Sequence, residues 1–436
     1  MSFIVLKTVN QANLEPPTFI PEGTYTITSE GTYDISNYEF IKVLIETGGV
    51  KQIVYSINAT WVVENDGTLW GCGSNAYGQQ GSKINDNVKV FTQRLTDVKE
   101  VYCSGLSTWA LKNDGSLWGC GWNNYGQQGS GNTTNVNTFT QRLTDVERVS
   151  ISSYTMWALK NDGTLWGCGD NQYGEQSTGD TSGVFTFSQR LTNVKDFFGS
   201  YCTTWAIKED GTLWGCGATQ DGKQGNGVSG SGSVATFTQR LTDVKKVIGS
   251  GSTTWAIKND NTLWGCGRNA LGQQGAGQSE SPITTFTQRL SNVKDFICSA
   301  DTSWAIKDDN TLWGCGDNDH GQQGSGDNVT ITTFTQRLTD VKSFLCSADT
   351  SWALKNDGTL WGCGSNSYGQ QGSGNTTDVN TFTQRLTNVK DFSCSTTTTG
   401  AIKKDGSLWS CGQNNLGQQG SGNTTDVLTF TERTLT

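Results

Sequence analysis

The sequence predicts an all-β fold, a β-propeller of four-stranded blades, and three observations support this prediction. The string LWGCG, or its near copy LWSCG, occurs eight times at intervals of 48 to 50 residues. Each interval contains four short β-forming stretches and no helical period. A single four-stranded unit cannot bury both of its faces, so the units are expected to stack around a common axis.

The repeats occupy residues 50–436 and follow an amino-terminal segment, residues 1–49, that lies outside the array. Uniform spacing and the lack of a degenerate copy favour eight blades; a seven-bladed ring with one copy outside it is the alternative. The last repeat is complete, so we expect no spare terminal strand that closes the ring through a shared blade. The predicted blades are residues 50–97, 98–145, 146–193, 194–243, 244–292, 293–340, 341–388 and 389–436.

The strands can be placed in the second repeat, where TWALKN alternates between two faces. The dipeptide Asp114-Gly115 predicts a hairpin turn, because such turns need a positive φ. Two other repeats carry Asn261 and Asn310 at the second turn position, and asparagine is the non-glycine residue that best tolerates a positive φ. The four predicted strands of this repeat are residues 98–103, 108–113, 116–121 and 138–143.

Fifteen of the sixteen tryptophans occupy two recurring positions, and Trp122 is the exception. One position is the tryptophan of LWGCG. The other lies nine residues earlier, where the eighth repeat has Gly400 instead. Tryptophan buries a large apolar area, and glycine beside it lets one sheet approach the next closely. We therefore expect these residues to pack between blades.

The thirteen cysteines form a row of eight, a row of four and Cys202, which is off both registers. A ring of thiols could bind a soft metal or form disulfides between blades. Metal ligands could not be replaced by other residues in half of the repeats, as the cysteines in the row of four are. We therefore interpret the cysteines as small buried hydrophobic residues. The other repeats have Tyr55, Ile151, Gly199 and Gly249 in that row. The row of eight is Cys72, Cys120, Cys168, Cys216, Cys266, Cys315, Cys363 and Cys411, and the row of four is Cys103, Cys298, Cys346 and Cys394.

A Gln-Arg pair recurs in the fourth strand, as in Gln141-Arg142, and the last repeat has Glu432-Arg433. All copies share the arginine. We therefore interpret the pair as an inter-blade hydrogen bond or ion pair rather than as a ligand site.

Composition and charge exclude several classes of function. The formal net charge is −9 and no run of basic residues occurs, which disfavours binding to nucleic acid. The single histidine, His320, leaves no histidine triad and no histidine metal site. The acidic pairs Asp308-Asp309 and Asp317/Asp319 lie at turns, where aspartate is common for backbone reasons. We expect no enzymatic activity, no cofactor and no metal.

No apolar run is long enough for a membrane span, and the first residues make a poor signal peptide.

The repeat unit DGTLWGCGxNxYGQQGSGNTT, followed by TWALKxDG after the next strand, resembles the repeat of the regulator of chromosome condensation family. The resemblance covers residues 50–436 and extends to bacterial and viral members with similar units. It implies a propeller, although family members have seven blades. The founding member is a nucleotide-exchange factor for a small GTPase and binds chromatin. This chain is acidic and has no basic amino-terminal tail, which argues against carrying that activity over.

The amino-terminal segment predicts short strands at residues 3–9, 24–28 and 40–45. Its stretch GTYTITSEGTYDISNYEFIKVLIETGG resembles small β modules near the ends of bacteriophage tail and fibre proteins. Two interpretations stay open: a β segment that caps or closes the propeller, and a docking module that holds the propeller on a larger assembly.

Recognition is expected on loops held by the rigid scaffold, because the repeats differ most before TFTQRL. We favour a non-enzymatic structural or binding protein of a phage virion, in the tail or fibre. Its partners would be other virion or assembly proteins through residues 1–49 and a host-surface glycan or protein. The alternatives are a regulator of a small GTPase and a free sugar-binding lectin, located in the cytoplasm or outside the cell. The candidate binding residues are Tyr77, Tyr125, Tyr173, His320 and Tyr368, which share one loop position.

Overall fold

The computed structural model describes residues 25–27, 43–45, 49–56, 58–104, 106–152, 154–200, 202–278, 281–299 and 301–435. Contacts divide the chain into two units, Met1–Gly49 and Val50–Thr436. In the first unit, β1 (Tyr25–Ile27) pairs in parallel with β2 (Val43–Ile45). These strands fall within two of the predicted amino-terminal strands; the third, at residues 3–9, lies outside the described residues.

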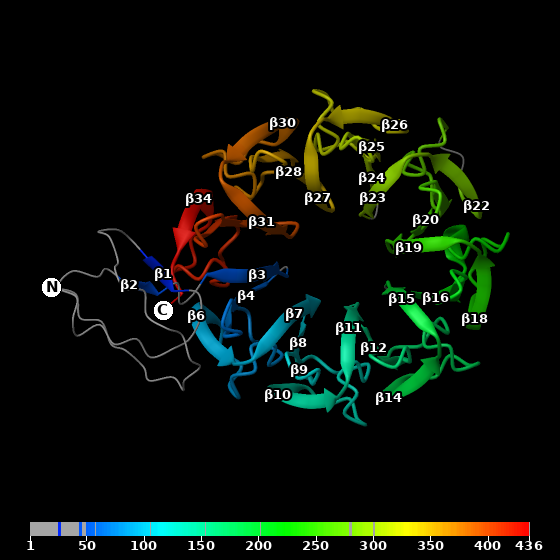
Figure 1. The fold of residues 1–436 in the computed structure, drawn as a ribbon, viewed down its shortest axis with the longest axis horizontal. Helices are drawn as coiled ribbons and strands as arrows, with labels where there is room; N and C mark the ends of the chain where they lie inside the picture. The colour runs from blue at the N-terminus through cyan, green and yellow to red at the C-terminus, as the bar shows by residue number, and fades with distance from the viewer. Residues whose placement is uncertain are drawn as a thin grey trace, which may run out of the picture. The chain divides into compact units, whose positions relative to one another are not determined.

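The second unit is a ring of eight four-stranded antiparallel sheets, each built from one repeat in sequence order (Figure 1). Eight blades are therefore confirmed, and the seven-bladed alternative is wrong. The first four blades are β3 (Val50–Tyr55), β4 (Ala59–Glu64), β5 (Leu69–Gly73), β6 (Val88–Leu95); β7 (Val98–Ser104), β8 (Ser107–Lys112), β9 (Leu117–Gly121), β10 (Val136–Leu143); β11 (Val146–Ile151), β12 (Thr155–Lys160), β13 (Leu165–Gly169), β14 (Val184–Leu191); and β15 (Val194–Gly199), β16 (Thr203–Lys208), β17 (Leu213–Ala218), β18 (Ser233–Leu241), with the 3-10 turn η1 (Gln220–Gly222) between the last two. The other four are β19 (Val244–Gly249), β20 (Thr253–Lys258), β21 (Leu263–Gly267), β22 (Ile283–Leu290); β23 (Val293–Cys298), β24 (Thr302–Lys307), β25 (Leu312–Gly316), β26 (Ile331–Leu338); β27 (Val341–Ser347), β28 (Thr350–Lys355), β29 (Leu360–Gly364), β30 (Val379–Leu386); and β31 (Val389–Cys394), β32 (Thr398–Lys403), β33 (Leu408–Gly412), β34 (Val427–Arg433).

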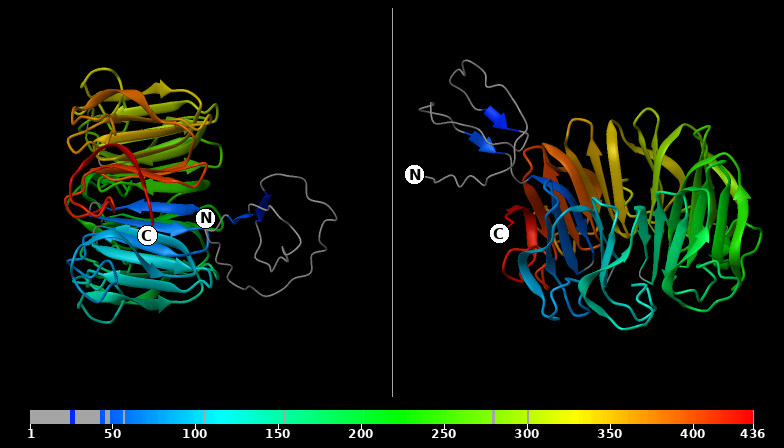
Figure 2. Two further views of the ribbon diagram at one scale, coloured as in Figure 1. Left: turned by 90° about the vertical axis from the view of Figure 1, so that its left-hand side faces the viewer. Right: turned by 60° about the horizontal axis from the view of Figure 1, so that its bottom comes forward.

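The first strand of each blade lies at the centre of the ring and the fourth at its perimeter (Figure 1). Turned edge-on, the ring shows its strands running between two loop-bearing faces (Figure 2). We call the face that carries the connections between first and second strands, and between third and fourth strands, the long-loop face. The tight 2–3 hairpins lie on the opposite face.

The core consists of the interfaces between blades, because the second strand of every blade buries both of its faces. Trp61 of the first blade packs with Val98, Val101 and Ala110 of the second, and its ring stands edge-on to Phe139 at 5.9 Å. All seven tryptophans of this row make the same T-shaped contact with a phenylalanine of the next blade. Each buried indole contributes roughly 4 to 6 kcal/mol as an upper bound from its area.

A β-bulge in every first strand explains an unexpected spacing of its buried residues. Val98 and Val101 are both buried, although residues three apart should face opposite sides of a strand. The register against the second strand shifts between Val98 and Glu100, so Lys99 is the extra residue, and the shift recurs in all eight blades. The predicted hairpin turns are confirmed, since their second residue has a positive φ throughout, including 65° at Asn261 and 62° at Asn310.

Each interface is also tied by a cysteine. Cys120 donates its S–H to the carbonyl oxygen of Gln79 in the preceding blade at 3.3 Å, and the other seven cysteines of this row repeat the contact. All eight are fully buried, and all thirteen cysteines are free thiols. The row of eight is therefore structural, and Cys72 closes the circle by bonding to Gln418 of the last blade.

The ring closes between the eighth and first blades without a shared strand. At this interface a small residue replaces the usual tryptophan, and a large residue of the first blade fills the space. Gly400 stands where the other blades have a buried tryptophan, and Tyr55 of the first blade fills the space, since a Cβ atom at Gly400 would overlap its phenol oxygen. Ser410 replaces the LWGCG glycine that would lie under that tryptophan, and it lies in hydrogen-bonding reach of the Tyr55 hydroxyl. Three departures from the repeat thus meet at one interface.

The closure predicts a compensating set of mutations. Gly400→Trp should lower the free energy of unfolding by about 3 kcal/mol or more, because the indole and Tyr55 would compete for one space. Tyr55→Cys should cost about 2–4 kcal/mol by leaving a cavity. The triple variant Tyr55→Cys, Gly400→Trp, Ser410→Gly rebuilds the ordinary interface and should regain most of the loss in urea unfolding. Additive losses in the triple variant would contradict the exchange.

Candidate recognition surface around Trp122

The long loop between third and fourth strands has one rigid frame in seven blades. In the first blade, the buried Asn75 accepts a hydrogen bond from the Gln80 backbone at 2.8 Å and donates to Ser82 at 2.7 Å. Gln80 in turn donates to the Cys72 carbonyl at 2.9 Å. Asparagine oxygen and amide groups can satisfy both sides of such a turn, which explains the GxNxxGQQG sequence. In the fourth blade, Thr219 stands in the asparagine position.

All five predicted binding residues lie at one point of this frame, on the long-loop face. The Tyr77 backbone N–H donates to the Gln79 side chain at 2.9 Å, and the other four are held in the same way by Gln127, Glu175, Gln322 and Gln370. The backbone is therefore fixed while the side chain points outward. Tyr77, Tyr125 and Tyr368 are 38–39% exposed.

Only two of the five predicted residues come together, and they do so around Trp122. Its ring centroid lies 6.2 Å from Tyr77, 5.4 Å from Tyr125 and 5.6 Å from Tyr154, and the two last rings are 4.7 Å apart. We call these four residues the aromatic cluster. Tyr77 belongs to the first blade, Trp122 and Tyr125 to the second, and Tyr154 to the third. The planes are tilted by 56–75°, a favourable arrangement for aromatic side chains.

Trp122 and Tyr154 were not predicted as site residues from the sequence. Trp122 was marked by being the one tryptophan outside both rows, which was a usable signal. Tyr154 lies in the connection between β11 and β12, and nothing in its own repeat relates it to Tyr125. Trp and Tyr offer large, rigid contact areas with a polar edge, and such residues dominate binding hot spots. The cluster can therefore make apolar contacts and hydrogen bonds together.

His320 lies elsewhere on the long-loop face, in an acidic sector of the sixth and seventh blades. Its Nδ1 is 2.9 Å from an Asp378 oxygen, and this hydrogen bond raises the pKa of His320 above its ordinary value. Burial raises the pKa of Asp349 and of Asp301, which also pairs with Arg268 at 3.3 Å. Within the described chain, no three His, Cys, Asp or Glu side chains are placed to hold a metal ion.

Glu175 is a second charged departure, because six repeats have glutamine in its place. One carboxyl oxygen accepts the Tyr173 N–H at 2.8 Å, while the other is buried without a hydrogen-bond partner among the described residues. Burial raises the pKa of Glu175 to about 7. The Asp170 charge contributes to this rise, and Lys223 opposes it.

The sequence predicted an inter-blade hydrogen bond or ion pair for the recurring Gln-Arg pair, and within the described residues its arginines form no ion pair. Arg142 and its equivalents in six other blades are half-buried, and their Nε atoms have no hydrogen-bond partner in the described part of the chain. Arg142 lines an open groove of about 390 Å³ with Lys160 and Trp166 of the next blade. The Lys160 ammonium lies 4.8 Å from the Trp166 ring centroid, and seven blades repeat this cation–π contact. Each of these cation–π contacts joins the second and third strands of one blade.

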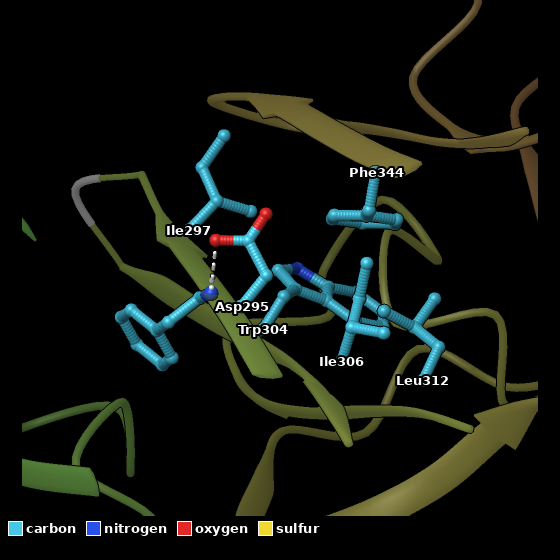
Figure 3. Close-up of a pocket in the computed structure, with 7 residues that line it drawn as sticks. Asp295, Ile297, Trp304, Ile306, Leu312 and Phe344 are labelled. Carbon is cyan, nitrogen blue, oxygen red and sulfur yellow. Dashed lines mark hydrogen bonds between the residues drawn. The ribbon is translucent and has the colours of Figure 1, made fainter. Parts of the chain in front are cut away.

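The void beside the buried Trp304 is too small for a ligand. Figure 3 shows Trp304 enclosed by Ile297, Ile306 and Leu312 of its own blade and by Phe344 of the next. The void there has a volume of about 10 Å³, the size of one water-sized probe. The interface at Trp304 therefore leaves no room for a ligand.

Comparisons with known proteins support an RCC1-type β-propeller. Residues 146–175 and 341–370 match the family model described as Regulator of chromosome condensation (RCC1) repeat. Saccharomyces cerevisiae Prp20p is similar with a TM-score of 0.60 and 17% identity over 79% of this chain and 91% of Prp20p. Yeast Prp20 in its complex with Kap60 gives the same score and identity over 90% and 94%. Human WBSCR16 has a TM-score of 0.57 and 17% identity over 73% and 90%.

At these identities the similarity shows the fold alone. A search of curated proteins finds no match. No described helix has the length and apolar character needed to cross a membrane.

The sole histidine permits a direct test of the acidic sector. In an NMR titration of the intact chain, His320 should titrate above the ordinary histidine pKa of about 6.5. Asp378→Asn should lower its midpoint, because the charged partner is lost while an asparagine can still cap the loop, as Asn135 does in the second blade. Asp426→Asn, the same change in the eighth blade, is the control and should leave His320 unaffected.

The raised pKa of His320 also determines how the stability of the fold changes with pH. The protonated His320–Asp378 pair stabilises the fold at low pH, and this contribution is lost as the pH rises through the folded-state pKa of His320. An unshifted titration in the natural chain would contradict the hydrogen bond.

Glu175→Gln should stabilise the ring in alkaline solution. A carboxyl whose pKa is raised to about 7 binds a proton more tightly in the folded state, so stability falls between about pH 4.5 and 7 and then levels off. The variant should therefore gain on the order of 2 kcal/mol at pH 8.5 and much less at pH 4.5, measured by urea unfolding. The exposed Glu209→Gln is the control. An equal effect at both pH values would show that Glu175 is not shifted.

Proposed function

We propose that this protein is a non-enzymatic binding propeller that attaches to a glycan on a host surface through the aromatic cluster. The cluster carries this proposal. It joins loops of three blades, and its Tyr77 and Tyr125 are more than a third exposed on a rigid frame. Such preorganisation lowers the entropic cost of binding.

The chemistry around the cluster favours an uncharged sugar. Aromatic rings pack against the C–H face of a pyranose, while phenol hydroxyls, the indole N–H and nearby carboxylates can bond to its hydroxyl groups. The Asp170 backbone N–H donates to the Tyr154 carbonyl at 2.9 Å, so an acidic residue is bonded to the backbone of a cluster residue. A net charge of −9 works against polyanionic partners.

In this proposal the propeller is part of a phage particle, in the tail or fibre, and residues 1–49 dock it there. The resemblance of that segment to β modules of tail and fibre proteins supports this placement. Many copies of one propeller on a particle would add weak sugar contacts into firm attachment by avidity. Electron microscopy of purified particles with a labelled antibody tests the placement; absence of label would overturn it.

Regulation of a small GTPase is the second candidate, favoured by one observation. The yeast structure with the same fold is described with binding properties to Gsp1p and histones. That activity would require accelerated nucleotide release from a GTPase mixed with the purified chain. Release at the intrinsic rate across a GTPase panel would set this candidate aside.

The glycan proposal is tested with matched tyrosines. Trp122→Ala and Tyr125→Ala should each weaken binding to purified surface polysaccharide at least about tenfold, since truncating a hot-spot aromatic costs more than ~1 kcal/mol. Tyr368→Ala is the control, because Tyr368 has the same loop position and the same 39% exposure as Tyr125 but lies outside the cluster. Calorimetry with a panel of neutral and acidic polysaccharides provides the affinities. Equal loss from Tyr125→Ala and Tyr368→Ala, or no binding to any polysaccharide, would contradict the proposal.

A further inference from the structure

The fourth blade places a thiol and an amine in direct contact. Lys223 Nζ lies 3.0 Å from Cys202 Sγ and 2.9 Å from the carbonyl oxygen of Gly251 in the fifth blade. Lys223 is 3% exposed and Cys202 is 5% exposed. Two reactive side chains are thus held together and shielded from most of the solvent.

Both residues differ from those at the same positions of the other repeats, and both differences occur in the fourth blade. Lys223 stands in the row where six repeats have glutamine, and Cys202 is the only cysteine of its row. The loop that carries Lys223 also departs, because η1 replaces the usual asparagine frame and Asp221 has a φ of 59°. The other residues of the Lys223 row are Gln79, Gln127, Glu175, Gln273, Gln322, Gln370 and Gln418, and those of the Cys202 row are Asn58, Leu106, Tyr154, Ser252, Asp301, Asp349 and Thr397.

The other cysteines do not have this environment. The eight cysteines of the structural row donate to backbone carbonyls between blades. In the described part of the chain, Cys202 is the one whose sulfur accepts a hydrogen bond from a lysine. An oxidised sulfur at this position would meet an amine nitrogen before it met another thiol.

We propose that Cys202 and Lys223 are a modification site, at which a peroxide oxidant joins the sulfur and the nitrogen in a covalent cross-link. This inference is independent of the glycan proposal. It ties the connection between β15 and β16 to the long loop of the same blade, on the long-loop face. The partner chemistry is a small peroxide, which is the size of reagent that can reach a site with 3–5% exposure.

The reaction has two steps. The thiol displaces water from hydrogen peroxide, so that sulfur is oxidised to sulfenic acid and the peroxide O–O bond is reduced to water. The Lys223 amine, after giving one proton to solvent, attacks the sulfur; the S–N bond forms, the S–O bond breaks, and the hydroxyl leaves as water. In sum, one thiol, one ammonium and one hydrogen peroxide give one S–N bond, two waters and one proton. A nitrogen held 3.0 Å away acts at a high effective concentration.

The rate of the first step depends on how readily the Cys202 thiol loses its proton. Burial raises the pKa of the Cys202 thiol, while Lys223 opposes the shift; Glu175 and Asp221 add to it. Thiolate is the nucleophile toward peroxide, so the cross-link should form slowly at neutral pH and faster in mildly alkaline solution. A thiol reductant should reverse it.

The test treats the intact chain with hydrogen peroxide, blocks remaining thiols with an alkylating reagent, and maps tryptic peptides by mass spectrometry. The expected product joins the peptides of Cys202 and Lys223, with the mass of two hydrogens lost, and disappears after reduction. A bridge that keeps one oxygen atom would also support the cross-link, with a second peroxide consumed. Recovery of Cys202 as an alkylated thiol, or as an oxidised acid with Lys223 unlinked, would overturn the proposal.

Two variants with small changes of side-chain size test the cross-link in chains that should still fold. Lys223→Gln restores the residue of six other repeats and should abolish the linked peptide, leaving Cys202 to proceed to sulfinic acid. Cys202→Ser should abolish it as well. Cys298, which has no lysine partner in the described residues, is the internal control in each sample and should not link to any lysine. A linked Lys223 peptide in Cys202→Ser would assign the cross-link to another cysteine and overturn the proposal.

Discussion

The buried indole that crosses from each second strand into the next blade is the contact on which the ring depends. A blade has two apolar faces and no core of its own, so its strands are stable only when both neighbours cover them. Seven interfaces meet this need with a tryptophan that is 0–1% exposed, set against a first strand and a phenylalanine of the following blade. An open row of blades would leave an apolar face at each end, and ring closure removes both. The eighth interface is therefore as necessary as the others, although its residues differ.

Local features of the fold could be predicted from the sequence, because each depends on a few neighbouring residues. The turn glycines and their replacements Asn261 and Asn310 identify positive φ, and the uniform period gives the eight blades. The closure could not be predicted in this way. Gly400 stood out as the exception in the tryptophan row, whereas Tyr55 was one of four residues other than cysteine in its row. They lie at opposite ends of the array, and only the closed ring brings them into contact. The recurring arginine of the Gln-Arg pair was also only partly predictable. Its presence in every repeat indicated a shared role, but it did not identify the contacts of the side chain.

The candidate site was partly predictable for a related physical reason. Sequence variation at one loop position selected five residues with equal weight, because the same backbone contact holds that position in each of these five repeats. The structure separates them. Tyr77 and Tyr125 join Trp122 and Tyr154, which come from two other rows, whereas His320 is drawn into an ion pair and Tyr368 stays outside the cluster. A contact between different rows of neighbouring blades leaves no periodic trace in the sequence.

The departures from the repeat divide the long-loop face into sectors of different chemistry. Aromatic residues gather on the first three blades, a buried glutamate, lysine and cysteine follow on the third and fourth, and aspartates surround His320 on the sixth and seventh. The backbone beneath most of these loops is the same, so the sectors differ through their side chains. A ligand that fits one sector meets unlike chemistry in the next. Such a ring can therefore bind one target in one orientation, although it is built from eight similar units.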